Sequence, residues 1–598
     1  MKLIGFDFGT TNSLVAHIQG VEAISFLDEE DRPTPSVVCY EGEQKILGRA
    51  AKKRLSQAGL GIQGNIVKSP KKSLGQPSIF VGGIEKRPAE IVADIVEHIL
   101  EEALSNSRSD GLKDISGAVV TIPINMPGYV RQALRDSFSL AGLRIFQFVH
   151  EPFAALYGFF RKDLEKMMRR YDKKIVLVVD WGGGTLDLTL CQMRQGELFQ
   201  LKNDGTEEVG GDIFDEAILN FVLQKFCNEK GIDAPNENSG ARARLFDTCE
   251  RAKIDLSSRT TTVIYVSEFF RNLDDNDFNY SLNREELDNI ALPLINKAFR
   301  RIVGILDGAG YSTEQVALCL MTGGMANMPA IKSRIHELFG PARTVVPQNT
   351  ATLVAEGAAW IAQDRNGLIL AKTVELEQAR GSFLPLIKAG TAMPKEGQVC
   401  KDTFHLYCTD PRDGIAKFQF CTPCRFGSVM LSEPRKALAD MTIRVDTKAR
   451  VFHERLELDV QINDNLILAM QAASLNVHDK DSCEIHELEF GLSFPMGSAE
   501  FFSLDNEPTN KAESQPREIG AIRVRSNIAD HDDQSLVPGE LLYTYKPSCF
   551  DERLRGLPFS ASEEQRREKL YYTPCSRCGR RSNDPACRHI APASNATP

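Results

Sequence analysis

The stretch LIGFDFGTTNSLVA, Leu3–Ala16, opens the chain with an apolar run, a polar turn and a return to apolar residues. This order predicts a strand, a tight turn and a second strand. In the turn, Gly9 lets the backbone come close to a ligand, and the hydroxyls of Thr10 and Thr11 are suited to donate to phosphate oxygens. Asp7, just before the turn, is placed to hold a magnesium ion through its waters. Taken alone, the stretch fits an ordinary hairpin as well as a phosphate site.

A second copy of this pattern, IVLVVDWGGGTLDLTL, occupies Ile175–Leu190. It again has an apolar strand, an aspartate (Asp180), a glycine turn and a returning strand, which here carries Asp187. The turn residues of this copy are Gly182, Gly183, Gly184 and Thr185. Two such hairpins in one chain predict two half-domains that close on one nucleotide. Neither copy is a P-loop, because a P-loop needs Gly-x-x-x-x-Gly-Lys-Ser/Thr at the start of a helix.

The length and charge of the chain narrow the function classes. With 598 residues it is too long for a single core and predicts about three or more domains. Its 71 basic and 81 acidic residues give a net charge of −10, which argues against a nucleic acid or an anionic membrane as partner. We see no uncharged apolar run of ~18 residues and no basic-then-apolar start. We therefore expect a soluble, cytoplasmic protein whose 14 cysteines are mostly reduced.

Five further motifs follow the order of a known family. They are VVTIP (Val119–Pro123), HEP (His150–Pro152), VGG (Val209–Gly211), ERAKIDLSS (Glu250–Ser258) and MTGG (Met321–Gly324). With the two hairpins, they make about the first 365 residues resemble the ATPase domain of the 70-kDa heat-shock chaperone (DnaK-type) family. The resemblance implies an α/β, two-lobed, actin-like (ribonuclease-H-like) fold around a deep nucleotide cleft. It also implies slow, magnesium-dependent hydrolysis of ATP.

The resemblance implies roles for individual residues. Lys71 best matches the family's catalytic lysine, which orients the attacking water and offsets charge on the transferring phosphoryl group. The register leaves Lys68 as the alternative. Glu151, Thr185 and Asp187 complete the implied catalytic set.

The implied ligand contacts extend along the whole domain. The nucleotide contacts are Asp7, Gly9, Thr10, Thr11, Asp180, Gly182, Gly183, Gly184, Gly210, Gly211, Glu250, Lys253, Ser257, Gly323 and Gly324. The residues that hold magnesium through water are Asp7, Asp180 and Asp187. The residues matching an ATP-sensing relay are Pro123 and Arg131. The spacing of Glu250, Lys253 and Ser257 puts them on one helix face, as a shared nucleoside contact requires.

The sequence departs from the family near the base and after the ATPase domain. Met325 and Asn327 stand where the family has a serine and an arginine that packs on adenine. Asn349–Leu353 replaces Asn-Pro-Asp-Glu-Ala. These changes leave ATP selectivity open. The family's apolar-acidic linker is missing or remodelled, because only Gln363–Gly367 precedes the apolar Leu368–Leu370. Coupling between the domains is therefore open as well.

Beyond the linker, alternating apolar residues predict a β-sandwich. The segments resembling the family's substrate domain are Phe383–Pro394 and Leu456–Val477, the latter a hairpin. The predicted domains are 1–365 (ATPase), 368–498 (β-sandwich) and 499–598 (a divergent C-terminal region). In the family the sandwich holds an extended polypeptide, and a plain sandwich for protein contacts is the alternative. The prolines that break a long helical lid are Pro508, Pro516, Pro538 and Pro547.

Cysteines near the C-terminus suggest a zinc site. Cys575 and Cys578 form the Cys-x-x-Cys-Gly turn that supplies two thiolates of a tetrahedral zinc site. The residues that complete a local site are Cys587 and His589, and the rival second pair is Cys421 and Cys424. A tail without structural metal is the third alternative.

These observations predict a chaperone-like protein in which ATP binding and hydrolysis control polypeptide binding by the sandwich. Its expected partners are an unfolded or specific polypeptide and a co-chaperone. One alternative is a dedicated assembly or regulatory switch for a single protein. The other is a small-molecule kinase of the same superfold.

Overall fold

We analysed a computed structural model of the chain, which divides by its internal contacts into two units. The first holds the residues up to Asn366 together with Leu492–Pro495, and the second holds Gly367–Gly491. The residues that the structure describes are 2–57, 65–105, 115–231, 237–238, 240–271, 276–378, 382–408, 410–427, 433–450 and 453–495. We describe each unit by itself.

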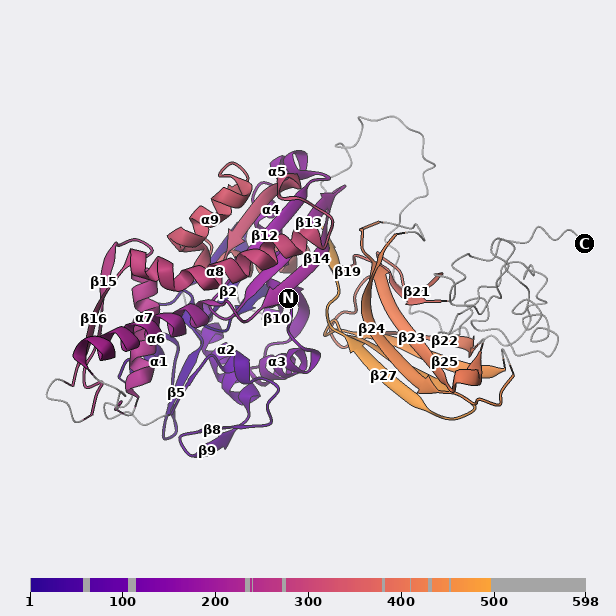
Figure 1. The fold of residues 1–598 in the computed structure, drawn as a ribbon, viewed down its shortest axis with the longest axis horizontal. Helices are drawn as coiled ribbons and strands as arrows, with labels where there is room; N and C mark the ends of the chain where they lie inside the picture. The colour runs from indigo at the N-terminus through magenta and orange to yellow at the C-terminus, as the bar shows by residue number, and fades with distance from the viewer. Residues whose placement is uncertain are drawn as a thin grey trace, which may run out of the picture. The chain divides into compact units, whose positions relative to one another are not determined.

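The first unit contains two sheets with the same topology (Figure 1). One has the order β11-β10-β1-β2-β3 with β4 beside β2, and the other has the order β18-β17-β12-β13-β14. Their strands are β1 (Lys2–Phe8), β2 (Asn12–Gln19), β3 (Glu22–Phe26), β4 (Thr34–Pro35), β10 (Ile115–Ile122) and β11 (Ile145–His150), then β12 (Ile175–Trp181), β13 (Leu186–Arg194), β14 (Glu197–Thr206), β17 (Val316–Thr322) and β18 (Thr344–Val345). In both sheets the hairpin strand pairs parallel with a crossover strand and antiparallel with its hairpin partner. The predicted pair of α/β half-domains is confirmed.

Two helices, α4 (Glu151–Arg161) and α10 (Leu353–Asp364), pack between these sheets. They cross at glycines: a Cβ on Gly357 would lie 1.8 Å from the carbonyl oxygen of Ala154, and one on Gly158 would lie 2.7 Å from the Cα of Gly357. Small residues are therefore required at the crossing. This close contact holds α4 and α10 against each other.

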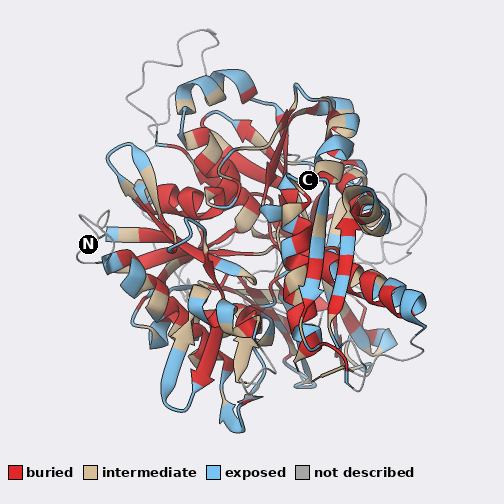
Figure 2. Cartoon of the chain, turned by 90° about the vertical axis from the view of Figure 1, so that its left-hand side faces the viewer, coloured by how far each residue is buried: buried red, intermediate tan, exposed pale blue. Residues whose placement is uncertain are grey.

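The other elements of the first unit surround this core. They are β5 (Val37–Glu41), β6 (Gln44–Leu47), α1 (Gly48–Leu55), β7 (Ile66–Lys68), η1 (Pro70–Ser73), β8 (Ile79–Val81), β9 (Ile84–Lys86), α2 (Pro88–Ser105), α3 (Gly128–Leu140), α5 (Leu164–Tyr171), α6 (Gly211–Lys230), α7 (Ala241–Asp255), β15 (Thr261–Val266), β16 (Phe278–Asn283), α8 (Arg284–Asp307), η2 (Thr313–Gln315), η3 (Gly324–Asn327) and α9 (Pro329–Phe339). Helix α8 begins at a capping box in which Asn283 and Glu286 each accept the other's backbone N–H. Burial concentrates on the sheet strands and on the inner helix faces (Figure 2).

The second unit consists mainly of two four-stranded antiparallel sheets, with the orders β21-β20-β23-β24 and β22-β25-β26-β27. Their strands are β20 (Val374–Glu377), β21 (Phe383–Ile387), β22 (Val399–Cys408), β23 (Ile415–Pro423), β24 (Arg435–Arg444), β25 (Glu454–Asn463), β26 (Leu468–Ser474) and β27 (Lys480–Ile485). Burial alternates along β25, as expected of a sandwich strand with one face inward. The short β19 (Ile369–Leu370) pairs with Phe490 and Gly491 of β28 (Phe490–Ser493).

The cysteine predictions fall on two parts of the chain. Cys575, Cys578, Cys587 and His589 lie outside the described residues. Cys421 is buried near the end of β23, and Cys424 follows that strand. Within the described ranges, no group of three or more His, Cys, Asp or Glu side chains is arranged to hold a metal ion. Nor does any helix in those ranges have the length and apolar character needed to cross a membrane.

Candidate functional site

One pocket of the first unit brings both hairpin turns together. The predicted residues that line it are Asp7, Gly9, Thr10, Thr11, Lys71, Glu151, Asp180, Gly182, Gly183, Gly184, Thr185, Gly323 and Gly324. The lining residues that we did not predict as ligand contacts are Asn12, Leu14, Pro33, Pro123, Thr350, Ala351 and Val354. We predict a place for Pro123 in the ATP-sensing relay, and Thr350 and Ala351 lie in Asn349–Leu353, which departs from the family sequence.

The two turns lie against each other, which explains their glycines. A Cβ on Gly184 would lie 2.8 Å from Oγ1 of Thr10, and one on Gly183 would lie 2.3 Å from Oγ1 of Thr11. Side chains at these positions would force the turns apart. The buried Oγ1 of Thr11 has no hydrogen-bond partner among the described residues. The turns therefore present an unsatisfied hydroxyl beside two stretches of bare backbone, which suits a phosphate group.

The two candidate lysines, Lys71 and Lys68, have different surroundings in the structure. Lys71 lies in the short helix η1, its side chain is 6% exposed, and its Nζ is 3.2 Å from Oε1 of Glu151 in the pocket. Lys68 instead lies over the ring of Phe246, and its Nζ is 3.8 Å from Oε2 of Glu250. Of the two, Lys71 is the one that lines the pocket between the turns.

Four carboxyl groups interact with the charge of Lys71. Asp7, Glu151 and Asp180 line the pocket, whereas Asp187 is buried and is not among the lining residues. Burial, with the charge of Glu151, raises the pKa of Asp7 to about 6 and that of Asp187 to about 7. The same two causes raise the pKa of Asp180 well above its usual value. Asp7 accepts a hydrogen bond from Thr121 at 2.7 Å, and Asp187 accepts one from a backbone N–H at 2.8 Å. In the described part of the chain no three of these groups are arranged to ligate a metal ion directly. Carboxyl oxygens of this kind suit a hard divalent cation that is held through its waters.

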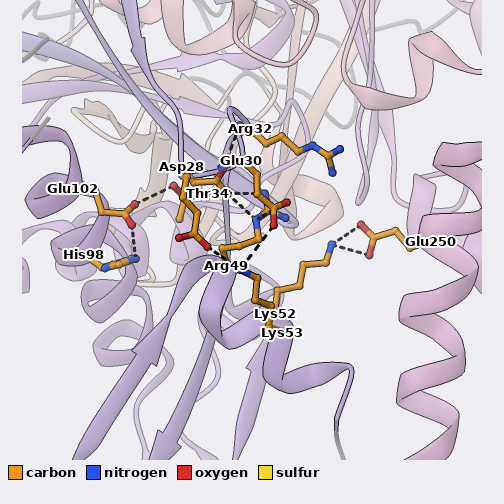
Figure 3. Close-up of polar contacts among 11 residues, drawn as sticks. Asp28, Glu30, Arg32, Thr34, Arg49, Lys52, Lys53, His98, Glu102 and Glu250 are labelled. Atoms are coloured by element: carbon orange, nitrogen blue, oxygen red, sulfur yellow. Dashed lines mark hydrogen bonds and ion pairs between the residues drawn. The ribbon is translucent and has the colours of Figure 1, made fainter. Parts of the chain in front are cut away.

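The residues assigned to adenosine lie beside this pocket and have protein partners. Lys253 donates to the carbonyl oxygen of Gly211 at 2.9 Å and is paired at 2.8 Å with Asp215, whose pKa burial raises to about 6. Oε1 of Glu250 is 3.0 Å from Nζ of Lys52 on α1 (Figure 3). Ser257 lies beyond the end of α7, so the prediction of one helix face for all three residues is wrong for Ser257; its Oγ donates to the carbonyl of Lys253 at 3.4 Å. None of these side chains is among the residues that line the pocket.

The remaining predicted residues lie close to the second turn. A Cβ on Gly210 would lie 2.4 Å from the carbonyl carbon of Gly184, so α6 begins directly against that turn. Met325 packs its sulfur toward Gly211, and Asn327 donates to Oγ1 of Thr350 at 3.3 Å. The two positions that depart from the family thus have contacts of their own.

A polar network fixes the position of α1. Asp28 accepts hydrogen bonds from the backbone N–H groups of Glu30 and Arg32 and pairs with Arg49 of α1 at 2.6 Å (Figure 3). The loop held in this way leads to Pro33, which lines the pocket. The same network orients α1 so that Lys52 faces Glu250. No local sequence signal predicts this network, because its ion pair joins Asp28 to Arg49 of a different element. Arg131, which the resemblance places in an ATP-sensing relay, is fully buried and donates to the carbonyl of Met126 at 2.9 Å.

Comparison with known proteins agrees with this geometry. The model of the family described as "Hsp70 protein" matches residues 3–78 and 62–493. The chain is 29% identical over 507 residues to the chaperone protein DnaK of Ureaplasma urealyticum serovar 10, a match that covers 82% of this chain and 79% of the relative. The same values hold for chaperone protein DnaK of Ureaplasma parvum serovar 3. The resemblance found in the motifs is confirmed, and the chain belongs to the Hsp70 family.

Proposed function

We propose that this protein is an ATP-hydrolysing chaperone in which the first unit binds magnesium and ATP and the second binds a polypeptide. One observation carries the proposal: two facing glycine turns, a buried lysine and three carboxyl groups line one pocket of an Hsp70 family member. A cytoplasmic location and a co-chaperone partner follow from the same family membership.

Different residues of the pocket have different roles in binding the nucleotide. Backbone N–H groups of the two turns, with the hydroxyls of Thr10 and Thr11, bind the phosphate oxygens. Asp7, Asp180 and Asp187 would hold magnesium through water, and magnesium held there would supply positive charge against the phosphates. The donor set fits this role, because burial and the neighbouring Glu151 raise the pKa values of Asp7 and Asp187, and a nearby cation would favour their ionised forms.

The reaction itself depends on a lysine and a glutamate. Glu151 accepts a hydrogen bond from the attacking water, and the ammonium group of Lys71 orients that water and stabilises charge that builds on the transferring phosphoryl group. The 3.2 Å contact between Lys71 and Glu151 holds both side chains ready before substrate binds. Thr185 donates to the γ-phosphate from the second turn.

The test is steady-state ATP turnover with magnesium, with and without a panel of unfolded apolar peptides. We expect slow turnover that many of these peptides raise. Turnover that ignores all of them would favour a dedicated switch for one protein partner. A purified protein that binds magnesium and ATP but never hydrolyses it would overturn the ATPase proposal.

A further inference from the structure

Ser36, which lies between β4 and β5, is fully buried against the first hairpin turn (residues 9–11). Its hydroxyl donates to the carbonyl oxygen of Gly9 at 3.0 Å. Its backbone N–H donates to the carbonyl oxygen of Thr11 at 2.9 Å. Gly9 and Thr11 both line the pocket, whereas Ser36 is not among the lining residues. Ser36 therefore holds the backbone of this turn at two points without lining the pocket itself.

The hydroxyl of Ser13 completes this contact. Ser13 is 1% exposed, and its Oγ lies 2.9 Å from Oγ of Ser36. A serine hydroxyl has one proton, and that of Ser36 goes to Gly9, so Ser13 must donate to Ser36. A residue without a hydroxyl at position 36 would leave the carbonyl oxygen of Gly9 without this donor and Ser13 without this acceptor. Because unsatisfied polar groups are costly when they are buried, the turn would shift toward other partners.

The carbonyl oxygen of Ser36 connects to the segment that carries Lys71. It accepts a hydrogen bond from the backbone N–H of Ser69 at 3.1 Å. Ser69 directly precedes η1 and has φ 56° and ψ 52°, a left-handed conformation that residues other than glycine seldom adopt. Its buried hydroxyl has no hydrogen-bond partner in the described part of the chain. Such strain persists only where the surroundings impose it, and the bond to Ser36 is one of the contacts that do so.

The path from Ser69 to Lys71 is short. The backbone N–H of Lys72 donates to the carbonyl oxygen of Ser69 at 3.0 Å and closes the turn that contains Lys71. The bond between Ser36 and Ser69 continues the pairing of β5 with β7, in which Val37 lies opposite Lys68. That backbone pairing holds Ser69 whichever side chain stands at position 36. The hydroxyl of Ser36 supplies the separate link to the first hairpin turn.

We propose that Ser36 is a positioning residue for ATP hydrolysis, whose hydroxyl keeps the first hairpin turn at the distance from Lys71 that the reaction requires. That turn would hold the phosphates and Lys71 would act on the transferring phosphoryl group, so their separation determines the geometry of the reaction. The inference rests on the proposed function, because it requires Lys71 to act on a phosphate bound by that turn. Ser36 itself acts only through Gly9 and Ser69.

Three substitutions of Ser36 in the full chain test the role of its hydroxyl. Ser36→Thr and Ser36→Val add side chains of nearly the same volume, and only threonine keeps the hydroxyl. We expect Ser36→Thr to retain most of the wild-type kcat and Ser36→Val to lower kcat about 10- to 100-fold, since a misplacement of ~1 Å can cost ~10²-fold. KM for ATP should change little in either variant, because the backbone N–H groups of both turns remain. Ser36→Ala should lower kcat as Ser36→Val does, and it adds no atoms to the buried site if the larger side chains prevent folding.

A double-mutant cycle with Lys71→Met separates positioning from a general effect on the structure. Single-turnover hydrolysis should be slower in Ser36→Ala than in wild type. In the Lys71→Met background, Ser36→Ala should have little further effect, because the group that Ser36 positions is gone. Urea unfolding of each variant checks that the compared proteins are folded.

The outcomes separate this inference from the proposed function. Equal kcat in folded Ser36→Thr and Ser36→Val proteins overturns the inference and leaves the ATPase proposal intact. Unchanged kcat in a folded Ser36→Ala protein does the same, as does a loss of rate by the same factor with and without Lys71. A wild-type protein that binds magnesium and ATP but never hydrolyses it overturns both.

Discussion

Removing the charge of Lys71 should stop hydrolysis while leaving ATP bound. The side chain is 6% exposed and its Nζ is 3.2 Å from Glu151, so its charge acts in a water-poor pocket where it is already oriented. Loss of one such preorganised group typically lowers kcat by about 10²–10³, or ~2.7–4 kcal/mol. We expect that loss for Lys71→Ala. ATP affinity should fall less, because the two turns still hold the phosphates.

Single-turnover hydrolysis of labelled ATP, with equilibrium binding measured in parallel, separates the two effects. Lys71→Met is the matched control for volume, since it keeps most of the side-chain volume and removes the ammonium group. Lys68→Ala is the control for position, and it should alter binding more than the rate, because Lys68 faces Glu250. If Lys71→Met hydrolyses ATP within about threefold of wild type, the electrostatic argument is wrong. If Lys68→Ala shows the large loss instead, the catalytic role belongs to Lys68.

Three further predictions concern the pocket and its supports. Lys52→Ala removes the 3.0 Å ion pair with Glu250 and should speed release of a fluorescent ADP analogue about fivefold, as expected for loss of ~1 kcal/mol. An unchanged release rate would show that this ion pair does not support nucleotide binding. Gly357→Ala puts a methyl group 1.8 Å from a carbonyl oxygen and should cost ~3 kcal/mol in urea unfolding, whereas Gly304→Ala, with open space around it, should be neutral or stabilising. Asp187, with its pKa raised from 3.8 to about 7, favours the folded state at low pH, and this contribution is lost as the pH rises from about 4 through about 7. Without nucleotide or metal, wild type should therefore lose more stability from pH 5 to pH 8 than Asp187→Asn does.

The hairpins and the duplication of the first unit were predictable because they depend on local signals. An apolar run, an aspartate and a glycine turn occur within about 14 residues at Leu3–Ala16, and the copy at Ile175–Leu190 repeats them. Strand pairing of this kind is set by neighbours along the chain. The approach of the two turns to each other followed from the repeat, since two half-domains with one ligand must face it together.

The contacts of α7 could not be predicted in the same way. Helical spacing predicts that Glu250 and Lys253 lie near each other on α7. It cannot predict which residues of other helices they contact. Lys52 and Asp215 come from other helices, and nothing in their local sequence marks them. The roles of these residues toward a nucleoside stay predictions. The docking of Leu492–Pro495, which follows the second unit in the chain, was missed for a similar reason. Nothing in the local sequence marks Phe494 as a residue that is buried against the first unit.

The docking of Leu492–Pro495 also bears on the order in which the protein is made. Ser493 and Glu197 bond to each other although 296 residues separate them, and the ring of Phe494 stacks on that of Tyr157 of α4. At ~5–20 residues per second, a ribosome needs on the order of 15–60 s to synthesise that interval. Throughout that time the hairpin between β13 and β14 and the aromatic face of α4 have emerged without the segment that covers them. Nascent chains therefore expose an apolar site on the first unit until the whole second unit has left the ribosome.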